Sequence, residues 1–157
     1  MKKGFTLLEL LVVIVIIILL ISMIMPAMNL FKEAAKRTKA RDSVQQLVTA
    51  WQTYLLNNRE FPDVDITEMT PIAVSNLTGF MEFTTNEVAK GFLDPWGTKV
   101  YQVRLDNGRG GDGKAYDGKV VLPGGVILQK SVAAWSKGKD GKDDLMSAPP
   151  KDDVRSW

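Results

Sequence analysis

The chain of 157 residues contains no cysteine and no histidine. Without cysteine it can form neither a disulfide framework nor a thiolate metal site. Without histidine it lacks the commonest general base near neutral pH and a frequent ligand of transition metals. Both absences argue against catalysis, and we expect a protein that is not an enzyme.

The charge shows no excess of one sign either, because 20 lysines and arginines face 18 acidic residues and leave a net charge of +2. Such a balance does not favour nucleic acid as a partner. The basic run from Lys32 to Arg41 is the local exception. Its cations alternate with apolar residues, so we interpret it as the solvated face of a helix rather than as a site for nucleic acid or lipid headgroups.

What the chain has in abundance is apolar sequence near its start, from Phe5 to Met25. The only polar residues of this run are Thr6, Glu9 and Ser22. A helix of this length spans roughly 31 Å, enough to cross a bilayer. Lys2 and Lys3 place its start on the cytoplasmic side, so the rest of the chain is expected in the periplasm.

Two plainer interpretations of the run exist. A cleaved signal peptide fits less well, because the run is long and no small-x-small cleavage site follows Met25. An ordinary signal anchor fits its length but does not explain Glu9. A carboxylate inside an apolar segment is costly unless it has a partner, although a position near the interface lowers the cost.

The octapeptide that contains Glu9 resembles the prepilin peptidase site of type IV pilins and pseudopilins; it reads Lys3-Gly4-Phe5-Thr6-Leu7-Leu8-Glu9-Leu10. The resemblance implies cleavage between Gly4 and Phe5 and N-methylation of the new amine of Phe5. It also implies that Glu9 meets the amino terminus of a neighbouring subunit during assembly. Residues 1–4 are then a leader, and prepilin peptidase is a partner.

The apolar run continues as an amphipathic pattern that predicts one helix over residues 5–57. Residues 5–25 would be its transmembrane and assembly half, and residues 26–57 its amphipathic half. Pro26 lies between them and predicts a kink, because proline removes a backbone hydrogen bond and clashes with the preceding turn. A helix of some fifty residues would be roughly 80 Å long, so lipid or other subunits must cover its first half.

Residues 58–157 are expected to form a periplasmic globular domain that begins where Pro62 breaks the helix. A short helix is predicted between Pro71 and Gly79, and β-branched residues predict three strand segments. These are Val100–Leu105, Lys119–Leu128 with a turn at Pro123-Gly124-Gly125, and Val132–Trp135. The predicted fold class is α+β, with a small antiparallel sheet packed on the amphipathic half of the long helix.

Two further patterns suggest no function. Residues 108–113 satisfy the dinucleotide pattern G-x-G-x-x-G, but a turn and a strand follow instead of a helix, so we interpret them as a hairpin tip. The carboxylates of Glu60, Asp94 and Asp106 are not brought together as an acid and base pair by any spacing.

Two stretches narrow the family. The turn Asp94-Pro95-Trp96-Gly97 and the segment from Ser136 to Trp157 resemble the signature of the major pseudopilin of type II secretion. The resemblance implies a homopolymer with minor pseudopilins, an inner-membrane assembly platform and membrane lipid before assembly. The filament would be periplasmic and would drive protein export. The chain departs from the pattern at Met146 and at Pro149-Pro150.

Two other functions remain open. The first is a type IV pilin of a surface filament for adhesion, motility or DNA uptake, which the absence of a cysteine pair near the end disfavours only slightly. The second is a periplasmic binding protein with a plain membrane anchor. For that protein Glu9 and the processing site would be coincidental.

The C-terminal loop 136–157 is a candidate calcium site. Asp140 lies on one side of the loop and Asp152 and Asp153 on the other, and carboxylates are the ligands that calcium prefers. Asp143 or Asp144 could substitute. The spacing is not that of an EF-hand, and the lysines of the loop offer an alternative pairing for the carboxylates. The pseudopilins that the chain resembles hold calcium at matching positions.

Overall fold

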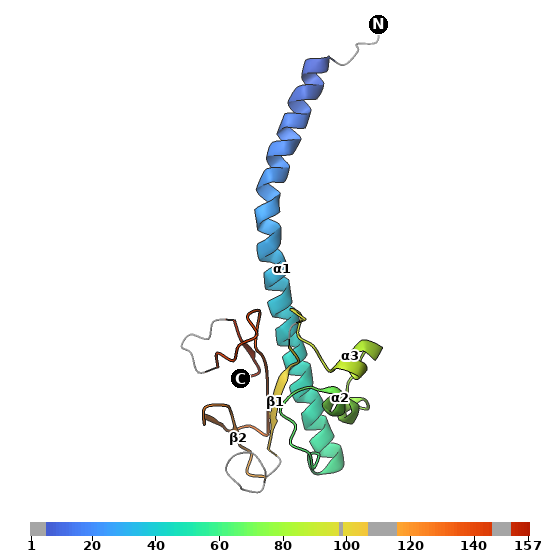
Figure 1. Cartoon of the computed structure of the whole chain (residues 1–157), viewed down its shortest axis with the longest axis vertical. Helices are drawn as coiled ribbons and strands as arrows, with labels where there is room; N and C mark the ends of the chain where they lie inside the picture. The colour runs from blue at the N-terminus through green and yellow to red at the C-terminus, as the bar shows by residue number, and fades with distance from the viewer. Residues whose placement is uncertain (1–5, 98, 107–115, 146–151) are drawn as a thin grey trace. The chain divides into compact units, whose positions relative to one another are not determined.

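The structure is a computed structural model that describes residues 6–97, 99–106, 116–145 and 152–157. Helix α1 (Leu7–Asn58) is followed by α2 (Pro71–Leu77) and α3 (Thr85–Lys90). The strands of the described part are β1 (Gln102–Leu105), β2 (Val120–Val121), β3 (Ile127–Leu128), β4 (Val132–Ser136) and β5 (Val154–Arg155) (Figure 1). The chain divides into two compact units, residues 1–36 and residues 37–157.

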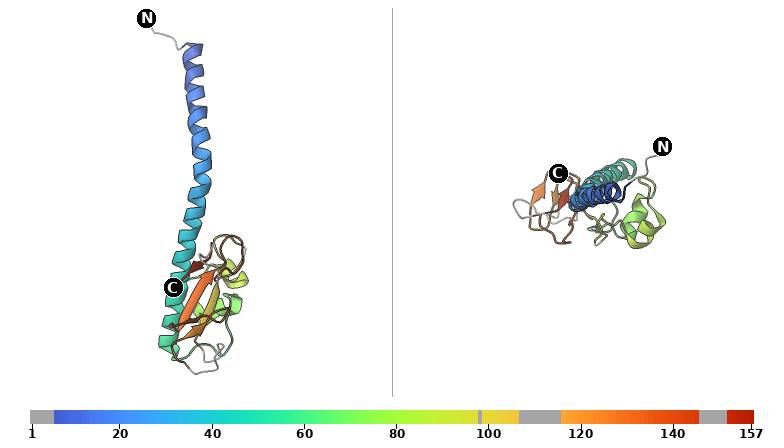
Figure 2. Two further views of the ribbon diagram at one scale, coloured as in Figure 1. Left: turned by 90° about the vertical axis from the view of Figure 1, so that its left-hand side faces the viewer. Right: turned by 90° about the horizontal axis from the view of Figure 1, so that it is seen from above.

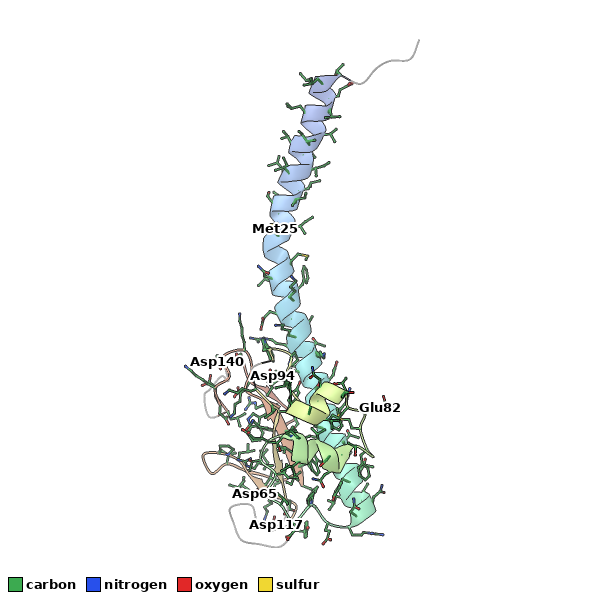
Figure 3. The ribbon with its side chains drawn as sticks, turned by 45° about the vertical axis from the view of Figure 1, so that its right-hand side comes forward. Met25, Asp65, Glu82, Asp94, Asp117 and Asp140 are labelled. Carbon is green, nitrogen blue, oxygen red and sulfur yellow. The ribbon has the colours of Figure 1, made fainter. Side chains whose placement is uncertain are left out.

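The first unit contains the apolar part of α1. Every large apolar side chain from Leu7 to Met25 is at least 46% exposed within the single chain, and Figure 3 shows these side chains projecting around the helix. Helix α1 continues through position 26. The side chain of Pro26 is not among the described ones, so the kink remains a prediction.

In the second unit the C-terminal part of α1 packs against α2 and the strands (Figure 2). Its buried positions begin at Ala40 and follow the predicted spacing of three and four residues. They continue with Val44, Leu47 and Trp51, each fully buried. These side chains share one core with α2, β1 and β4. The amphipathic pattern is therefore confirmed from Ala40 onward.

The strands form two antiparallel sheets instead of the one predicted. One has the order β1-β4-β5 and the other pairs β2 with β3. The hairpin between β2 and β3 turns at Pro123-Gly124-Gly125 as expected, and Leu122 N donates to Val126 O across it at 2.8 Å. The long helix with small antiparallel sheets confirms the α+β class.

Strand β4 is covered on both of its faces. Val132 and Ala134 belong to the core shared with α1, whereas Ala133 and Trp135 join a second cluster that contains Val120 of β2. Side chains alternate between the two faces of a strand, so a strand covered on both sides shows an unbroken buried run. All five residues of β4 are accordingly buried.

Two elements were not predicted. Helix α3 begins with a capping box in which Thr84 and Glu87 satisfy each other's backbone amides, and its Thr-x-x-Glu signal was present in the sequence. Strand β5 lies inside the segment interpreted as a loop and pairs with the end of β4, Ser136 with Val154. A strand of two residues carries no pattern of its own, so no local signal announced it.

Candidate functional site

The first candidate site is the start of α1. Thr6 N and Thr6 Oγ1 both donate to Glu9 Oε2, at 2.8 and 2.9 Å, and Glu9 N donates to Thr6 Oγ1 at 3.2 Å. This reciprocal arrangement is a capping box, which satisfies amides that the first helical turn leaves open. The position of the Glu9 carboxylate is thus fixed by Thr6 of the same chain. The residues expected at the cleavage point, Gly4 and Phe5, lie outside the described residues.

Thr6 is a residue that the sequence reasoning missed. It was counted only as a polar member of the apolar run, although Thr6-x-x-Glu9 is the spacing of a capping box. Within the described residues, α1 is also the one helix with a stretch long and apolar enough to cross a membrane. None of the side chains in that stretch is buried inside the chain.

The second candidate site lies at the loop that joins β4 to β5. Gly138 takes a φ of +65° there. The next two amides, of Lys139 and Asp140, donate to Asp152 Oδ2 at 2.7 and 3.1 Å. Asp140 Oδ1 in turn accepts from Lys142 N at 2.9 Å. The loop therefore closes on the carboxylate of Asp152.

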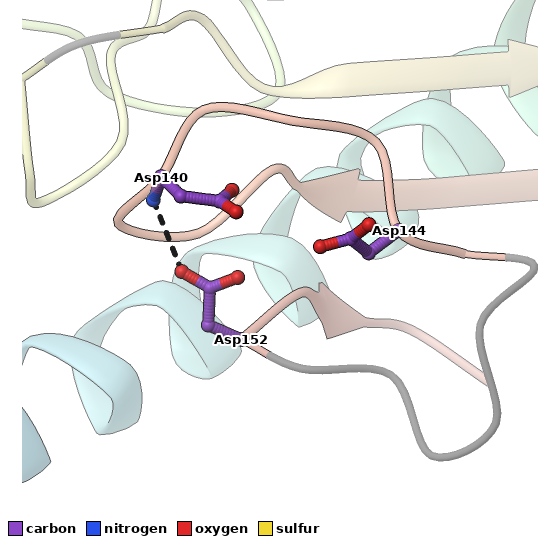
Figure 4. Close-up of side chains that lie close together, drawn as sticks. All are labelled: Asp140, Asp144 and Asp152. Carbon is purple, nitrogen blue, oxygen red and sulfur yellow. Dashed lines mark hydrogen bonds between the residues drawn. The ribbon is translucent and has the colours of Figure 1, made fainter.

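This closure brings three carboxylates together. Asp140, Asp144 and Asp152 can each offer one oxygen such that all three atoms lie within 4.8 Å of one another (Figure 4). Of the three residues chosen from the sequence, Asp140 and Asp152 belong to this group. Asp144 was named as a substitute. Asp153 lies beside the group, and its Oδ2 accepts from Asp144 N at 2.8 Å.

The carboxylates of this loop lie close together and are partly buried. Burial raises the pKa of Asp153 to about 6. The hydrogen bond from the Asp144 amide opposes this shift, and the carboxylates of Asp143, Asp144 and Asp152 add smaller upward contributions. Asp152 Oδ1 and Asp153 Oδ1 are buried, and neither has a hydrogen-bond partner in the described part of the chain. Crowded, partly buried carboxylate oxygens are the donor set that suits a calcium ion, so these residues fit one.

The Asp-Pro-Trp-Gly turn lies against the same loop. Asp94 is only 4% exposed, and its Oδ1 accepts from Gly97 N at 2.9 Å. Its Oδ2 accepts from Ser136 Oγ at 3.1 Å. Trp96 is half-buried, and the fully buried aromatic residue after the turn is Tyr101. The two stretches that carry the family resemblance are thus in direct contact.

Neither buried aspartate of the second unit forms a pair suited to acid and base chemistry in the described part. Asp94 is bonded to a serine and an amide, and Asp106 Oδ2 accepts from Gly118 N at 2.7 Å. Glu60 is exposed. The pattern at residues 108–113 falls outside the described residues.

Comparison with known proteins finds relatives for the start of the chain and for most of its length. Residues 1–25 match the prokaryotic N-terminal methylation motif. The chain is 36% identical over 102 residues to the type II secretion system core protein G of Pectobacterium carotovorum, and this alignment covers 62% of the chain and 64% of that protein. No solved structure matches the chain.

A second relative is matched over almost its full length. The type II secretion system core protein G of Escherichia coli is 30% identical over 151 residues, which cover 90% of this chain and 96% of that protein. On this alignment, the apolar start of α1 and the observed fold, the chain belongs to the family of type II secretion system core protein G, the major pseudopilins.

Proposed function

We propose that the chain is the filament-forming subunit of a periplasmic pseudopilus that drives protein export through the type II secretion system. One observation carries the proposal: α1 presents apolar side chains, at least 46% exposed, from Leu7 to Met25 without any cover from its own chain. Such a surface is stable only against lipid or other subunits. The family membership of the chain supports cover by other subunits after assembly.

The proposed life of the subunit begins in the inner membrane, with residues 37–157 in the periplasm. Prepilin peptidase removes residues 1–4, and the amine of Phe5 is methylated. The subunit then leaves the lipid through an inner-membrane assembly platform and joins a homopolymer that also contains minor pseudopilins. The methylation motif over residues 1–25 supports the processing step. No nucleic acid takes part.

Glu9 is the residue proposed to guide assembly. Both hydrogen bonds from Thr6 end on Oε2 of Glu9, so Oε1 can accept from the amino terminus of a neighbouring subunit while the capping box stays closed. A carboxylate and an ammonium that leave water together are tolerated, whereas either alone is costly. The pairing therefore favours a subunit docked next to another over one docked alone.

Assembly of the Glu9→Ala variant tests this role. We expect normal membrane insertion, because the apolar run keeps its length and loses only a charge. We expect a filament yield lowered on the order of tenfold or more, because the neighbour's amine loses its partner. The exposed Glu82, in the second unit, supplies the matched control Glu82→Ala. Normal filament yield from Glu9→Ala would refute the role of Glu9.

The location of the filament in the cell distinguishes the pseudopilus from the type IV pilin and from the anchored binding protein. Subunits confined to a periplasmic filament, together with loss of protein export in cells lacking the chain, are expected. A filament that extends from the cell surface while export continues would favour a type IV pilin. A chain that keeps residues 1–4 and forms no filament would favour an anchored binding protein.

We also propose that the loop between β4 and β5 binds calcium through Asp140, Asp152 and Asp153, with Asp144 as a further ligand. The ion would neutralise the crowded carboxylates and satisfy the buried oxygens Asp152 Oδ1 and Asp153 Oδ1. It would also offset the conformational entropy of a polar loop that buries little apolar surface. Its role would be structural, because it links the two ends of the loop.

Unfolding in chelator and in millimolar calcium tests this site. If affinity lies in the range of extracellular calcium modules, about 10⁻⁴ to 10⁻³ M, calcium should stabilise the fold by about 1 kcal/mol. Asp153→Ala and Asp152→Asn should reduce this gain, whereas Asp65→Asn, at an exposed carboxylate elsewhere in the second unit, should retain it. Identical melting of all forms in both conditions would leave the loop an ordinary charged segment.

A further inference from the structure

Two stretches far apart in the sequence are joined by one buried pair of side chains. Ser136 Oγ donates to Asp94 Oδ2 at 3.1 Å. Asp94 is 4% exposed and Ser136 is fully buried. A buried polar group that loses its partner is costly because water cannot replace the bond. Each of these two side chains therefore fixes the position of the other.

Ser136 extends this connection into the acidic loop, by which we mean the segment between β4 and β5 that carries Asp140, Asp144 and Asp152. Its Oγ also accepts from Gly138 N at 3.1 Å, and its backbone pairs with Val154 of β5 at the end of the sheet. The chain then reverses at Gly138, which aims the amides of Lys139 and Asp140 at Asp152 Oδ2. The direction of these two amides thus depends on the Ser136 hydroxyl.

The turn that contains Asp94 supports the loop at a second point. Asp94 N donates to Lys99 O at 2.9 Å, which closes the turn. The Lys99 side chain then passes beside Gly141, where a Cβ would lie 3.5 Å from both Cγ and Cε of Lys99. The loop therefore rests on the turn at both Ser136 and Gly141.

We propose that Asp94 and Ser136 are positioning residues for the acidic loop. The chain of bonds runs from Gly97 N through Asp94 and Ser136 to Gly138, and the next amides hold Asp152. Neither Asp94 nor Ser136 belongs to the group formed by Asp140, Asp144 and Asp152. Their effect is to set the loop before an ion arrives, which lowers the ordering that binding itself must supply. The inference rests on the calcium site proposed above for the identity of that ion.

The experiment uses the full chain in detergent and measures two quantities. The first is calcium affinity by isothermal titration, and the second is hydrogen exchange of the amides of residues 138–140 in chelator. For Ser136→Ala we expect about tenfold weaker calcium binding and about tenfold faster exchange, the effect of losing a hydrogen bond of ordinary strength. The exchange measurement does not depend on calcium.

Two further variants separate positioning from general loss of stability. Ser156→Ala removes a hydroxyl of the same kind, one that accepts from Ala134 N at 3.1 Å in the same sheet, and should leave calcium affinity and loop exchange near those of the unmodified chain. Asp94→Asn keeps one oxygen for Gly97 and gains an N–H that can donate to Ser136, so it should retain most of both properties. Asp94→Ala should behave like Ser136→Ala.

The outcomes separate this inference from the calcium proposal. Unchanged exchange and affinity in both Ser136→Ala and Asp94→Ala would overturn the positioning role. If the unmodified chain binds no calcium but exchange still rises in these two variants and not in Ser156→Ala, the positioning role stands and the calcium proposal fails. An equal rise in Ser156→Ala would reduce the role of Ser136 to general stability and overturn the inference.

Discussion

Gly138 lies so close to Asp152 that no side chain fits between them. A Cβ at Gly138 would stand 2.5 Å from the carbonyl oxygen of Asp152 and 2.7 Å from its Cγ. The positive φ of +65° also favours glycine at this position. The sequence presented Gly138 as one of several glycines in a polar segment, whereas the structure makes it the point where the two ends of the acidic loop meet.

We expect Gly138→Ala to open this loop. The backbone strain of alanine at a positive φ costs about 1 kcal/mol, and the clash with Asp152 adds to it, so a loss of about 2 to 3 kcal/mol in the free energy of unfolding is expected. Urea unfolding of the full chain in detergent measures it. The control is Gly125→Ala, because Gly125 has a φ of +81° and no atom within 4 Å of an added Cβ. Equal losses in both variants would contradict the contact.

Processing gives a second prediction. Mass spectrometry of the protein from cells with an intact prepilin peptidase should find a chain that begins at Phe5 and carries one added methyl group. Gly4→Val should leave residues 1–4 attached, because a branched side chain replaces the glycine at the proposed cleavage point. A mature unmodified chain that still begins at Met1 would contradict the processing site.

Solubility gives a third prediction. The full-length chain should need detergent or filament partners, because the apolar side chains of residues 7–25 are exposed. A chain shortened to begin at Asn29 should be soluble and largely monomeric, although Leu30 and Phe31 remain 76% and 73% exposed. Sedimentation in plain buffer compares the two chains. A full-length chain that stays monomeric without detergent would contradict membrane anchoring.

A fourth prediction concerns alkaline pH. Tyr101 is fully buried in the core of the second unit, and burial, foremost, raises its pKa from 10.0 to about 12. The folded state therefore holds this proton more tightly than the unfolded state does. The protonated phenol of Tyr101 therefore stabilises the folded state fully below pH 10, and this contribution is lost as the pH rises toward 12.

Replacing Tyr101 by phenylalanine tests the effect. Tyr101→Phe should lose less stability between pH 9 and pH 11 than the unmodified chain, because it has no phenol to ionise. The urea midpoint at the two pH values is the measurement. The same pH dependence in both proteins would show that Tyr101 is not the group responsible.

Local signals were sufficient for much of the fold. The apolar run predicted the first half of α1, and the spacing of Val44, Leu47 and Trp51 predicted its packing face. Pro123-Gly124-Gly125 predicted the hairpin. Each of these features depends on residues within a few positions of one another, so periodicity or turn chemistry alone can specify it. Glu9 also stood out locally, as a carboxylate in an apolar run.

The tertiary structure decided the features that depend on long-range pairing. Asp94 meets Ser136 across 42 positions of the chain. Strand β5 exists because it pairs with the end of β4, Trp135 with Arg155 and Ser136 with Val154. Asp144 lies with Asp140 and Asp152 because the loop closes at Gly138. A sequence shows which side chains are available, but the backbone path between β4 and β5 determines which carboxylates share one space.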